Sequence, residues 1–148
     1  MRPEAIKPLE ALVGEWEFAA SVQGRESARG RTRFEWMEDG TFVLQRADAE
    51  PLDEFWAKHS PFPTTSVIGA DDGDGRFSML YSDARGVVRI YEMTLEDGVW
   101  NVWREAPGFR QRFVGTFSDD GLTISAHWDR SSDGSDWARD FDMTYTRV

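Results

Sequence analysis

The chain has 148 residues, 30% charged and 40% hydrophobic, which is typical of a globular protein with one domain spanning residues 1–148. Its formal net charge of −10 repels phosphate backbones and anionic lipid surfaces, so we expect neither a nucleic acid nor a membrane as partner. The chain has no cysteine, which excludes disulfides, thiol catalysis and cysteine-based metal sites and fits a reducing compartment.

The N-terminal segment predicts a short helix and no targeting signal. It carries Glu4 and Glu10 and has no apolar core, so we do not expect a signal peptide. No window approaches the roughly 20 apolar residues of a membrane span, and we therefore expect a cytoplasmic protein. Residues 8–13 predict one helical turn, because Pro8 suits a first helical position and Gly14 suits the stop.

After Gly14 the hydrophobic pattern changes to a period of two. Trp16 and Phe18 lie on one face of the predicted strand, and Glu15 and Glu17 lie on the other. This alternation indicates a strand with one face in water. Asp-Gly and related turn signals then recur along the chain. They separate predicted strands at residues 15–22, 29–37, 41–48, 64–70, 76–82, 87–95, 99–105, 109–117, 122–130 and 137–147.

This series of about ten antiparallel strands predicts an all-β fold. Consecutive hairpins without a long return connection favour an up-and-down β-barrel over a Greek-key sandwich. Residues 49–63 interrupt the series, and residues 52–59 within them predict a helical turn. A connection of this length is often a functional lid. The alternative is a structural cap that closes one barrel end with Phe55, Trp56 and Phe62.

Several segments resemble known barrel proteins. LEALVGEW at residues 9–16 resembles the opening of calycin-like barrels, in which the Trp packs at the closed end. Three later segments are similar to a family of small, mostly uncharacterised bacterial proteins with a lipocalin-like barrel: DARGVVRIYEM, WREAPGFRQRFVGTFSDDG and DGSDWARDFDMTYTR. The resemblance spans essentially the whole chain but defines no chemistry, because that family has no established catalytic residues. A distant resemblance to the nitrobindins implies haem binding through an axial histidine.

The two histidines argue against haem. A proximal ligand must point into the cavity. His127 falls on the opposite face of its strand from Ile124, Ala126 and Trp128, so we expect it to point away from the cavity. His59 lies in the long connection and could fold over a barrel mouth. We expect no cofactor, no metal site and no catalytic residue, since most carboxylates sit in Asp-Gly turns.

Some predicted strands place a polar side chain on an apolar face. Arg89 shares a face with Val87, Tyr91 and Met93. Arg46 follows Phe42 and Leu44, and Gln111 lies between Phe109 and Phe113. Burying an unpaired guanidinium is costly, so an inward arginine needs a carboxylate, water or an anionic ligand. The alternative is that these arginines reach solvent with their stems packed on the barrel.

The sequence therefore predicts non-covalent binding of a small, mainly apolar ligand with an anionic head. Residues 55–62 would gate entry. The predicted polar anchors are Arg46, Arg89 and Gln111, and the predicted walls are Trp16, Phe34, Trp36, Tyr91, Trp103 and Trp128.

Two alternatives stay open. One is an enzyme that uses the same cavity, with Asp48 or Glu92 as a buried base. The other is a barrel without a cavity that acts through its surface or as a homodimer. The inward faces of 99–105 and 109–117, with Arg104 and Arg112, stay open too.

Overall fold

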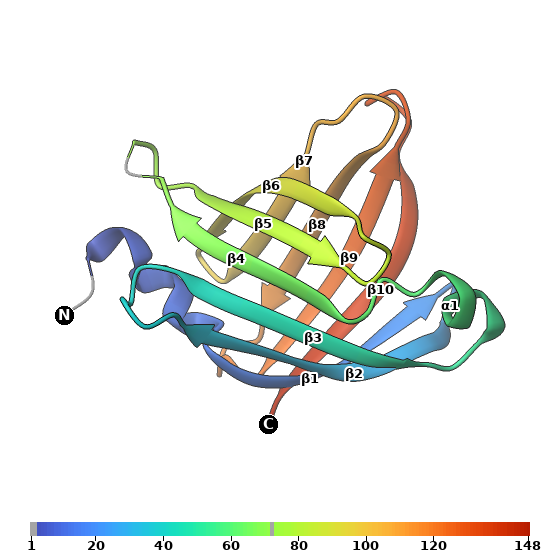
Figure 1. The fold of residues 1–148 in the computed structure, drawn as a ribbon, viewed down its shortest axis with the longest axis horizontal. Helices are drawn as coiled ribbons and strands as arrows, with labels where there is room; N and C mark the ends of the chain where they lie inside the picture. Colours follow the sequence, from blue (N-terminus) through green and yellow to red (C-terminus); the bar gives the residue numbers. More distant parts are fainter. Residues whose placement is uncertain (1–2, 72) are drawn as a thin grey trace.

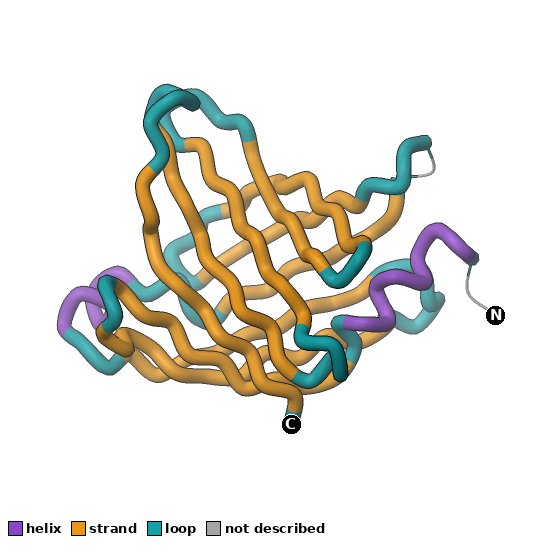
Figure 2. Tube along the Cα trace, turned by 180° about the vertical axis from the view of Figure 1, so that it is seen from behind, coloured by secondary structure: helices purple, strands orange, loops and turns teal. Residues whose placement is uncertain are grey.

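The computed structural model describes residues 3–71 and 73–148 as a closed antiparallel β-barrel (Figures 1 and 2). The prediction of an all-β barrel is confirmed, and most strand ranges agree within one residue with those expected from the turns, although β2 begins four residues earlier and β3 ends three residues later. The elements in chain order are η1 (Glu4–Ala11), β1 (Gly14–Val22), β2 (Arg25–Trp36), β3 (Val43–Pro51), α1 (Glu54–His59), β4 (Thr64–Ala70), β5 (Phe77–Asp83), β6 (Val88–Glu96), β7 (Val99–Arg104), β8 (Arg110–Phe117), β9 (Thr123–Ser131) and β10 (Ala138–Arg147).

Each strand pairs with its neighbours in sequence, and β1 pairs with β10 to close the ring. The closing register runs from Trp16 opposite Arg147 to Ser21 opposite Asp142. No crossover interrupts this order, so the topology is up-and-down as the hairpins predicted. Among the described residues, no helix is long and apolar enough to cross a membrane.

The 3₁₀-helix η1 covers one end of the barrel, which we call the closed end. It differs from the predicted turn at 8–13, because it begins at Glu4, ends at Ala11 and contains Pro8 in its interior. The physical reason is a three-residue spacing that suits a 3₁₀-helix. Ile6, Leu9 and Leu12 follow this spacing, and all three are buried.

Trp16 and Arg147 seal the closed end. Trp16 is fully buried, and its Nε1 donates to the Leu12 carbonyl at 2.9 Å. The Arg147 guanidinium lies 4.1 Å from the Trp16 ring centroid and donates to the carbonyls of Ala11 and Val13, at 2.7 Å each. Gly14 is required beneath it, because a Cβ there would lie 2.6 Å from Arg147 Nη1 and the backbone has a φ of +129°.

The helix α1 lies at the other end of the barrel, the open end (Figure 1). Asp53 caps it by accepting a hydrogen bond from Trp56 N at 2.8 Å. The Trp56 ring is buried and packs against Phe62 and Phe141, with centroids 6.1 and 5.4 Å away. Phe55 is instead 67% exposed. Two of the three aromatic residues expected to close this end therefore pack there.

Candidate functional site

The barrel encloses a cavity of about 890 Å³ that reaches the open end. This volume falls within the range of small-molecule sites, roughly 300–1,000 Å³. Aromatic and aliphatic side chains from five strands form its inner part: Phe18, Met79, Trp100, Val102, Phe113, Met143 and Tyr145. The Trp100 and Phe113 rings pack edge to face with centroids 4.7 Å apart, which gives the cavity a rigid wall.

One polar cluster on the cavity wall is built around Gln111, whose side chain is buried. Gln111 Oε1 accepts from the Tyr91 hydroxyl at 2.9 Å and from Arg89 Nη1 at 3.3 Å. The Arg89 guanidinium also lies 5.2 Å from the Phe109 ring centroid. Burial raises the pKa of Tyr91 despite the opposing effect of Arg89, so its hydroxyl stays protonated and donates.

Two further arginines flank this cluster. Arg104 and Arg130 are the cross-strand neighbours of Gln111 on β7 and β9, and opposite side chains of an antiparallel pair share a face. Within residues 3–71 and 73–148, no carboxylate lies within 4.0 Å of the guanidinium of Arg89, Arg104 or Arg130. Carboxylates are not scarce in a chain with 27 acidic residues and 17 basic ones. The cluster thus concentrates positive charge without a close ion pair, and Asp140 is a carboxylate whose electrostatic interaction with Arg130 is evident.

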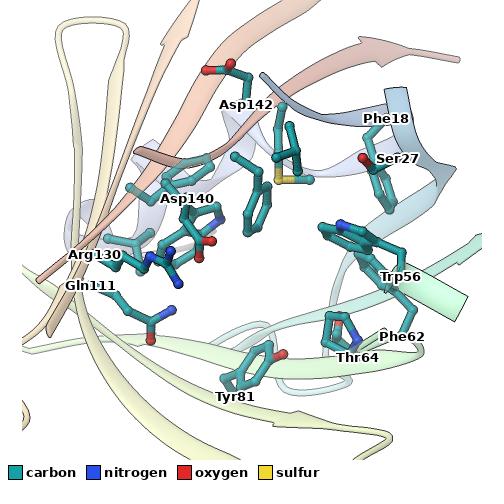
Figure 3. Close-up of a pocket in the computed structure, with 18 of the residues that line it drawn as sticks. Phe18, Ser27, Trp56, Phe62, Thr64, Tyr81, Gln111, Arg130, Asp140 and Asp142 are labelled. Atoms are coloured by element: carbon teal, nitrogen blue, oxygen red, sulfur yellow. The ribbon is translucent and has the colours of Figure 1, made fainter. Parts of the chain in front are cut away.

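Two β-bulges shape the open end on either side of β1. The register of β2 against β1 shifts at Ser27, and the register of β10 against β9 shifts at Asp140. Both residues line the cavity. A bulge adds one residue to a strand and thereby changes the direction of a side chain. Figure 3 shows Asp140 beside Arg130, across the opening from Trp56. Burial raises the pKa of Asp140, and the charge of Arg130 opposes that shift.

Asp83 organises the rim at the turn between β5 and β6. Its carboxylate accepts from the Tyr81 hydroxyl at 2.8 Å and from Arg85 Nη2 at 2.7 Å. Burial alone would raise the pKa of Asp83, but the hydrogen bonds from Arg85 and Tyr81 outweigh it and lower the pKa to about 2. The ionised carboxylate therefore fixes Tyr81 and Arg85, which both line the cavity.

The structure brings four of the seven predicted binding residues together: Arg89, Tyr91, Gln111 and Trp128 line the cavity. The Trp128 ring lies 5.7 Å from Tyr91 and 5.1 Å from Phe113, centroid to centroid. That these residues bind a ligand stays a prediction.

The inward orientation predicted for Arg46 is wrong. Arg46 is exposed on the outer face of β3, and Gln45 and Ala47 line the cavity instead. The cause is an apolar outer face on this strand. Phe42 packs there over Gly69, where a Cβ would lie 2.8 Å from its ring. The hydrophobic alternation therefore gave the wrong face.

The predicted wall tryptophans on β2 and β7 are also corrected. Trp103 lies on the outer face, where its Nε1 donates to Glu92 Oε2 at 3.0 Å, and Trp100 takes the inner position. Trp36 packs partly buried against the core but does not line the cavity. Trp16 and Phe34 are fully buried, yet they belong to the core of the closed end and are not cavity walls.

The carboxylates expected as a buried base lie outside the cavity. Glu92 is exposed and pairs with Arg76 at 3.0 Å, and Asp48 is exposed on β3. The location predicted for both is wrong. Sequence reasoning missed Asp140, because nothing in the pattern of residues 137–147 signals the bulge.

The two histidines differ in position. His127 does not line the cavity, and its Nε2 lies 3.6 Å from Asp129 Oδ2. His59 lines the cavity from α1 and packs against the exposed Phe55 ring, with centroids 4.8 Å apart. The described part of the chain contains no group of three or more histidine and carboxylate side chains that could hold a metal ion.

Comparison with solved structures places this architecture among known barrels. The crystal structure of Rv2717c from M. tuberculosis is similar with a TM-score of 0.63 and 14% sequence identity, covering 100% of this chain and 99% of that one. EF1p2_mFAP2b bound to DFHBI has a TM-score of 0.48 and 10% identity, over 98% of this chain and 100% of that one. No family model and no curated protein matches the sequence. The likeness to Rv2717c shows a shared barrel fold.

Proposed function

We propose that the chain binds a small, mainly apolar molecule with an anionic group inside the barrel, without covalent chemistry. One observation carries this proposal. Arg89 and Arg130 line an aromatic cavity with Gln111, and Arg104 is a cross-strand neighbour of Gln111. Among the described residues, no carboxylate lies within 4.0 Å of these three guanidinium groups. Apolar walls with a few fixed polar groups are the usual design of small-ligand barrels.

The Gln111 cluster is arranged to receive an anion. Tyr91 and Arg89 both donate to Gln111 Oε1, so they fix the amide with its oxygen turned toward them. In the described structure Gln111 Nε2 donates to no protein group. A carboxylate or sulfonate at this wall can therefore accept from the amide and from a guanidinium. Such charge-assisted hydrogen bonds contribute roughly 1.5–3 kcal/mol.

Residues 55–62 form the entrance of the proposed site. Trp56 and Phe62 pack on Phe141 and Phe18 through ring contacts rather than hydrogen bonds between side chains. These contacts support a gate, because ring packing can separate without leaving a buried polar group unpaired.

Titration with 1-anilinonaphthalene-8-sulfonate, an aromatic anion that fluoresces in apolar surroundings, tests the site. We expect saturable binding, and we expect Arg89→Met to weaken it by about tenfold or more, because it removes a charge-assisted bond. Arg46→Met is the matched control on the outer face and should leave the affinity unchanged. Equal effects of both substitutions would show that dye binding depends only on the overall charge of the protein.

We expect no tight binding of haem, since His127 lies outside the cavity. Haemin titration should give no sharp Soret band. A band that disappears in His59→Ala would show that α1 supplies a ligand. A band that disappears in His127→Ala would overturn the orientation described above.

We further propose that the outer face of β3–β6 pairs with a second copy of the chain. Leu44, Val67, Leu80 and Ile90 form one cross-strand row on this face, next to Val88. Leu80, Val88 and Ile90 are 51%, 64% and 71% exposed. The row itself is uncharged, although the chain carries a charge of −10. Glu35 lies opposite Leu44 at one end of the row, and Glu92, two residues from Ile90, is paired with Arg76. A two-fold contact of this kind is the commonest homo-oligomeric arrangement.

Sedimentation velocity at several protein concentrations tests the dimer. We expect the wild-type chain to be dimeric and Ile90→Lys to be monomeric, with unchanged circular dichroism. Thr116→Lys on the outer face of β8 is the control and should stay dimeric. A wild-type chain that is monomeric at all concentrations would contradict the proposal.

The finer assignments are proposals as well. We infer a calycin-like relationship, with small bacterial barrels and more distantly the nitrobindins as relatives, and the fold shared with Rv2717c supports the calycin-like part. We also infer one domain over residues 1–148 and a cytoplasmic location. The single domain is supported by the barrel, whose strands run from Gly14 to Arg147. Limited proteolysis tests the single domain, and we expect it to yield no stable fragment.

A further inference from the structure

The cavity has a second polar surface, separate from the Gln111 cluster. It consists of side chains from β2, β3 and β4 with hydroxyl or amide groups: Ser27, Thr32, Gln45, Thr64 and Ser66. We call this set the hydroxyl wall. The register joins it into one patch, since Gln45 is opposite Ser66 and Thr64 is opposite Ala47. None of its members is charged, so its chemistry is hydrogen bonding alone.

Several polar atoms of the hydroxyl wall lack protein partners. Gln45 Nε2 donates to Thr32 Oγ1 at 3.2 Å, and Thr32 Oγ1 donates to the Arg46 carbonyl at 3.2 Å. In the described structure the hydroxyls of Ser66 and Thr64 make no hydrogen bond, although these residues are only 2% and 8% exposed. Both residues line the cavity, and neither hydroxyl is among the fully buried unpaired polar atoms of the described residues, so both hydroxyls are accessible from the cavity and free to bond a ligand.

The hydroxyl wall lies across the cavity from Gln111 itself. Arg89 is nearer to the wall, because Ser66, Tyr81 and Arg89 form one cross-strand row over β4, β5 and β6. In a closed ring of ten strands, β3 and β8 are five positions apart, as are β4 and β9. Gln45 on β3 is therefore diametrically opposite the strand of Gln111, and Ser66 on β4 is opposite the strand of Trp128 and Arg130. Phe113 follows Gln111 on the inner face of β8, and its ring is in edge-to-face contact with Trp100 on β7.

From this arrangement we infer that the cavity selects a flat aromatic anion that carries a hydroxyl or carbonyl group on the edge opposite its anionic group. The inference rests on the proposed function and specifies its ligand class. A simple alkyl carboxylate satisfies only the Gln111 cluster and leaves the hydroxyls of Ser66 and Thr64 against hydrocarbon. A site that offers hydrogen bonds discriminates against an isostere that cannot make them, because its buried polar groups then stay unpaired.

Two naphthoates of nearly equal size test the inference. In 6-hydroxy-2-naphthoate a hydroxyl stands across the ring system from the carboxylate, and in 6-methyl-2-naphthoate a methyl group replaces it. We expect the wild-type chain to bind the hydroxyl compound about fivefold more tightly, as measured by quenching of tryptophan fluorescence, because one hydrogen bond is gained.

Variants then assign the preference to the hydroxyl wall. Ser66→Ala and the isosteric Thr64→Val should each reduce the preference for the hydroxyl compound toward equal binding. Ser78→Ala, an exposed serine on the outer face of β5, is the control and should leave the preference unchanged. Arg89→Met should weaken both compounds by about tenfold and keep the preference, because it acts on the carboxylate.

The outcomes separate the inference from the proposed function. Equal affinities for the two compounds in the wild-type chain, with the loss in Arg89→Met retained, would overturn the hydroxyl-wall inference and leave the proposed function standing. A preference that survives in both Ser66→Ala and Thr64→Val would also overturn it. Failure of both compounds to bind the wild-type chain would overturn the inference and the proposed function together.

Discussion

The two ends of the barrel each place an arginine against an aromatic ring, with opposite consequences. At the closed end, Arg147 lies over Trp16 and donates from both terminal nitrogens to backbone carbonyls at 2.7 Å. At the open end, Arg89 lies near Phe109 and makes one longer hydrogen bond, to Gln111 at 3.3 Å. The first guanidinium is satisfied by its own chain, and the second keeps most of its donors free.

This difference teaches how one kind of residue pair can serve stability or binding. A guanidinium that donates to backbone carbonyls and packs on an aromatic ring of its own chain stabilises the fold, and its removal takes that donor from the carbonyls. A guanidinium with free donors beside a cavity contributes little to folding, but it keeps its hydrogen-bonding capacity for a ligand. The following predictions test whether stability is concentrated at the closed end and binding at the open end.

The largest expected effect is at the closed end. Replacing Trp16 with Ala should lower the free energy of unfolding by roughly 3–5 kcal/mol in urea denaturation, because a large buried aromatic side chain is removed. The same substitution at Trp103, on the outer face, should cost about 1 kcal/mol or less. A loss below about 1 kcal/mol for Trp16→Ala would show that the closed end does not hold the fold together.

Arg147 and Arg89 should differ in the same sense. Arg147→Met should lower the free energy of unfolding by about 2 kcal/mol, since the carbonyls of Ala11 and Val13 lose their donors. Arg89→Met should change it by less than about 1 kcal/mol, because the stem volume is kept and a partly buried charge is removed. Urea denaturation of the two variants measures both changes. A larger loss of stability in Arg89→Met than in Arg147→Met would contradict the difference between the two ends.

The pH dependence of stability tests the role of Asp83 at the rim. The lowered pKa of Asp83, about 2 against 3.8 for an ordinary aspartate, means that its contribution is fully present above pH 3.8 and is lost as pH falls toward 2. Asp83→Asn should therefore cost about 1 kcal/mol at pH 7, a modest value because Arg85 is partly screened by solvent. Its stability should also depend less on pH between 4 and 2. An unchanged acid limb of the stability curve would contradict this role.

The fold was predictable from the sequence because turn chemistry is local. The EDG signal at residues 96–98 marks the hairpin between β6 and β7, where Asp97 and Gly98 both have positive φ values, of 54° and 73°. Such a turn fixes its own geometry and the register of the strands beside it. The same holds for the other short hairpins, so the order of the barrel followed from the spacing of the turns.

The candidate site was only partly predictable, because a strand's inner face depends on its neighbours. On β6 the alternation placed Arg89 and Tyr91 on the face that lines the cavity. On β3 the pattern placed Arg46 inside, although it lies outside. On β7 both faces carry large apolar residues and the inner face stayed open, so the prediction of Trp103 as a wall residue rested on no assigned face, and Trp103 lies outside. Asp140 depends on a bulge defined by pairing with β9, which no local pattern encodes.

The smallest expected effect concerns Asp140, and its sign is opposite to that of Asp83. Burial raises the pKa of Asp140, with Arg130 opposing, so the folded chain holds this proton more tightly than the unfolded chain does. The resulting destabilisation is present above the folded pKa and disappears below the unfolded value of 3.8. Asp140→Asn should therefore raise the free energy of unfolding at pH 7 by about 0.5 kcal/mol, a small gain because the group is only half-buried. The gain should vanish near pH 3.5.

Asp119→Asn, which removes an exposed negative charge from the turn before β9, controls for relief of general repulsion in a chain of charge −10. Urea denaturation of both variants at the two pH values measures the difference. Equal gains for Asp140→Asn and Asp119→Asn would show that the cavity imposes no special cost on its carboxylate, and that the open end is more solvated than its lining indicates.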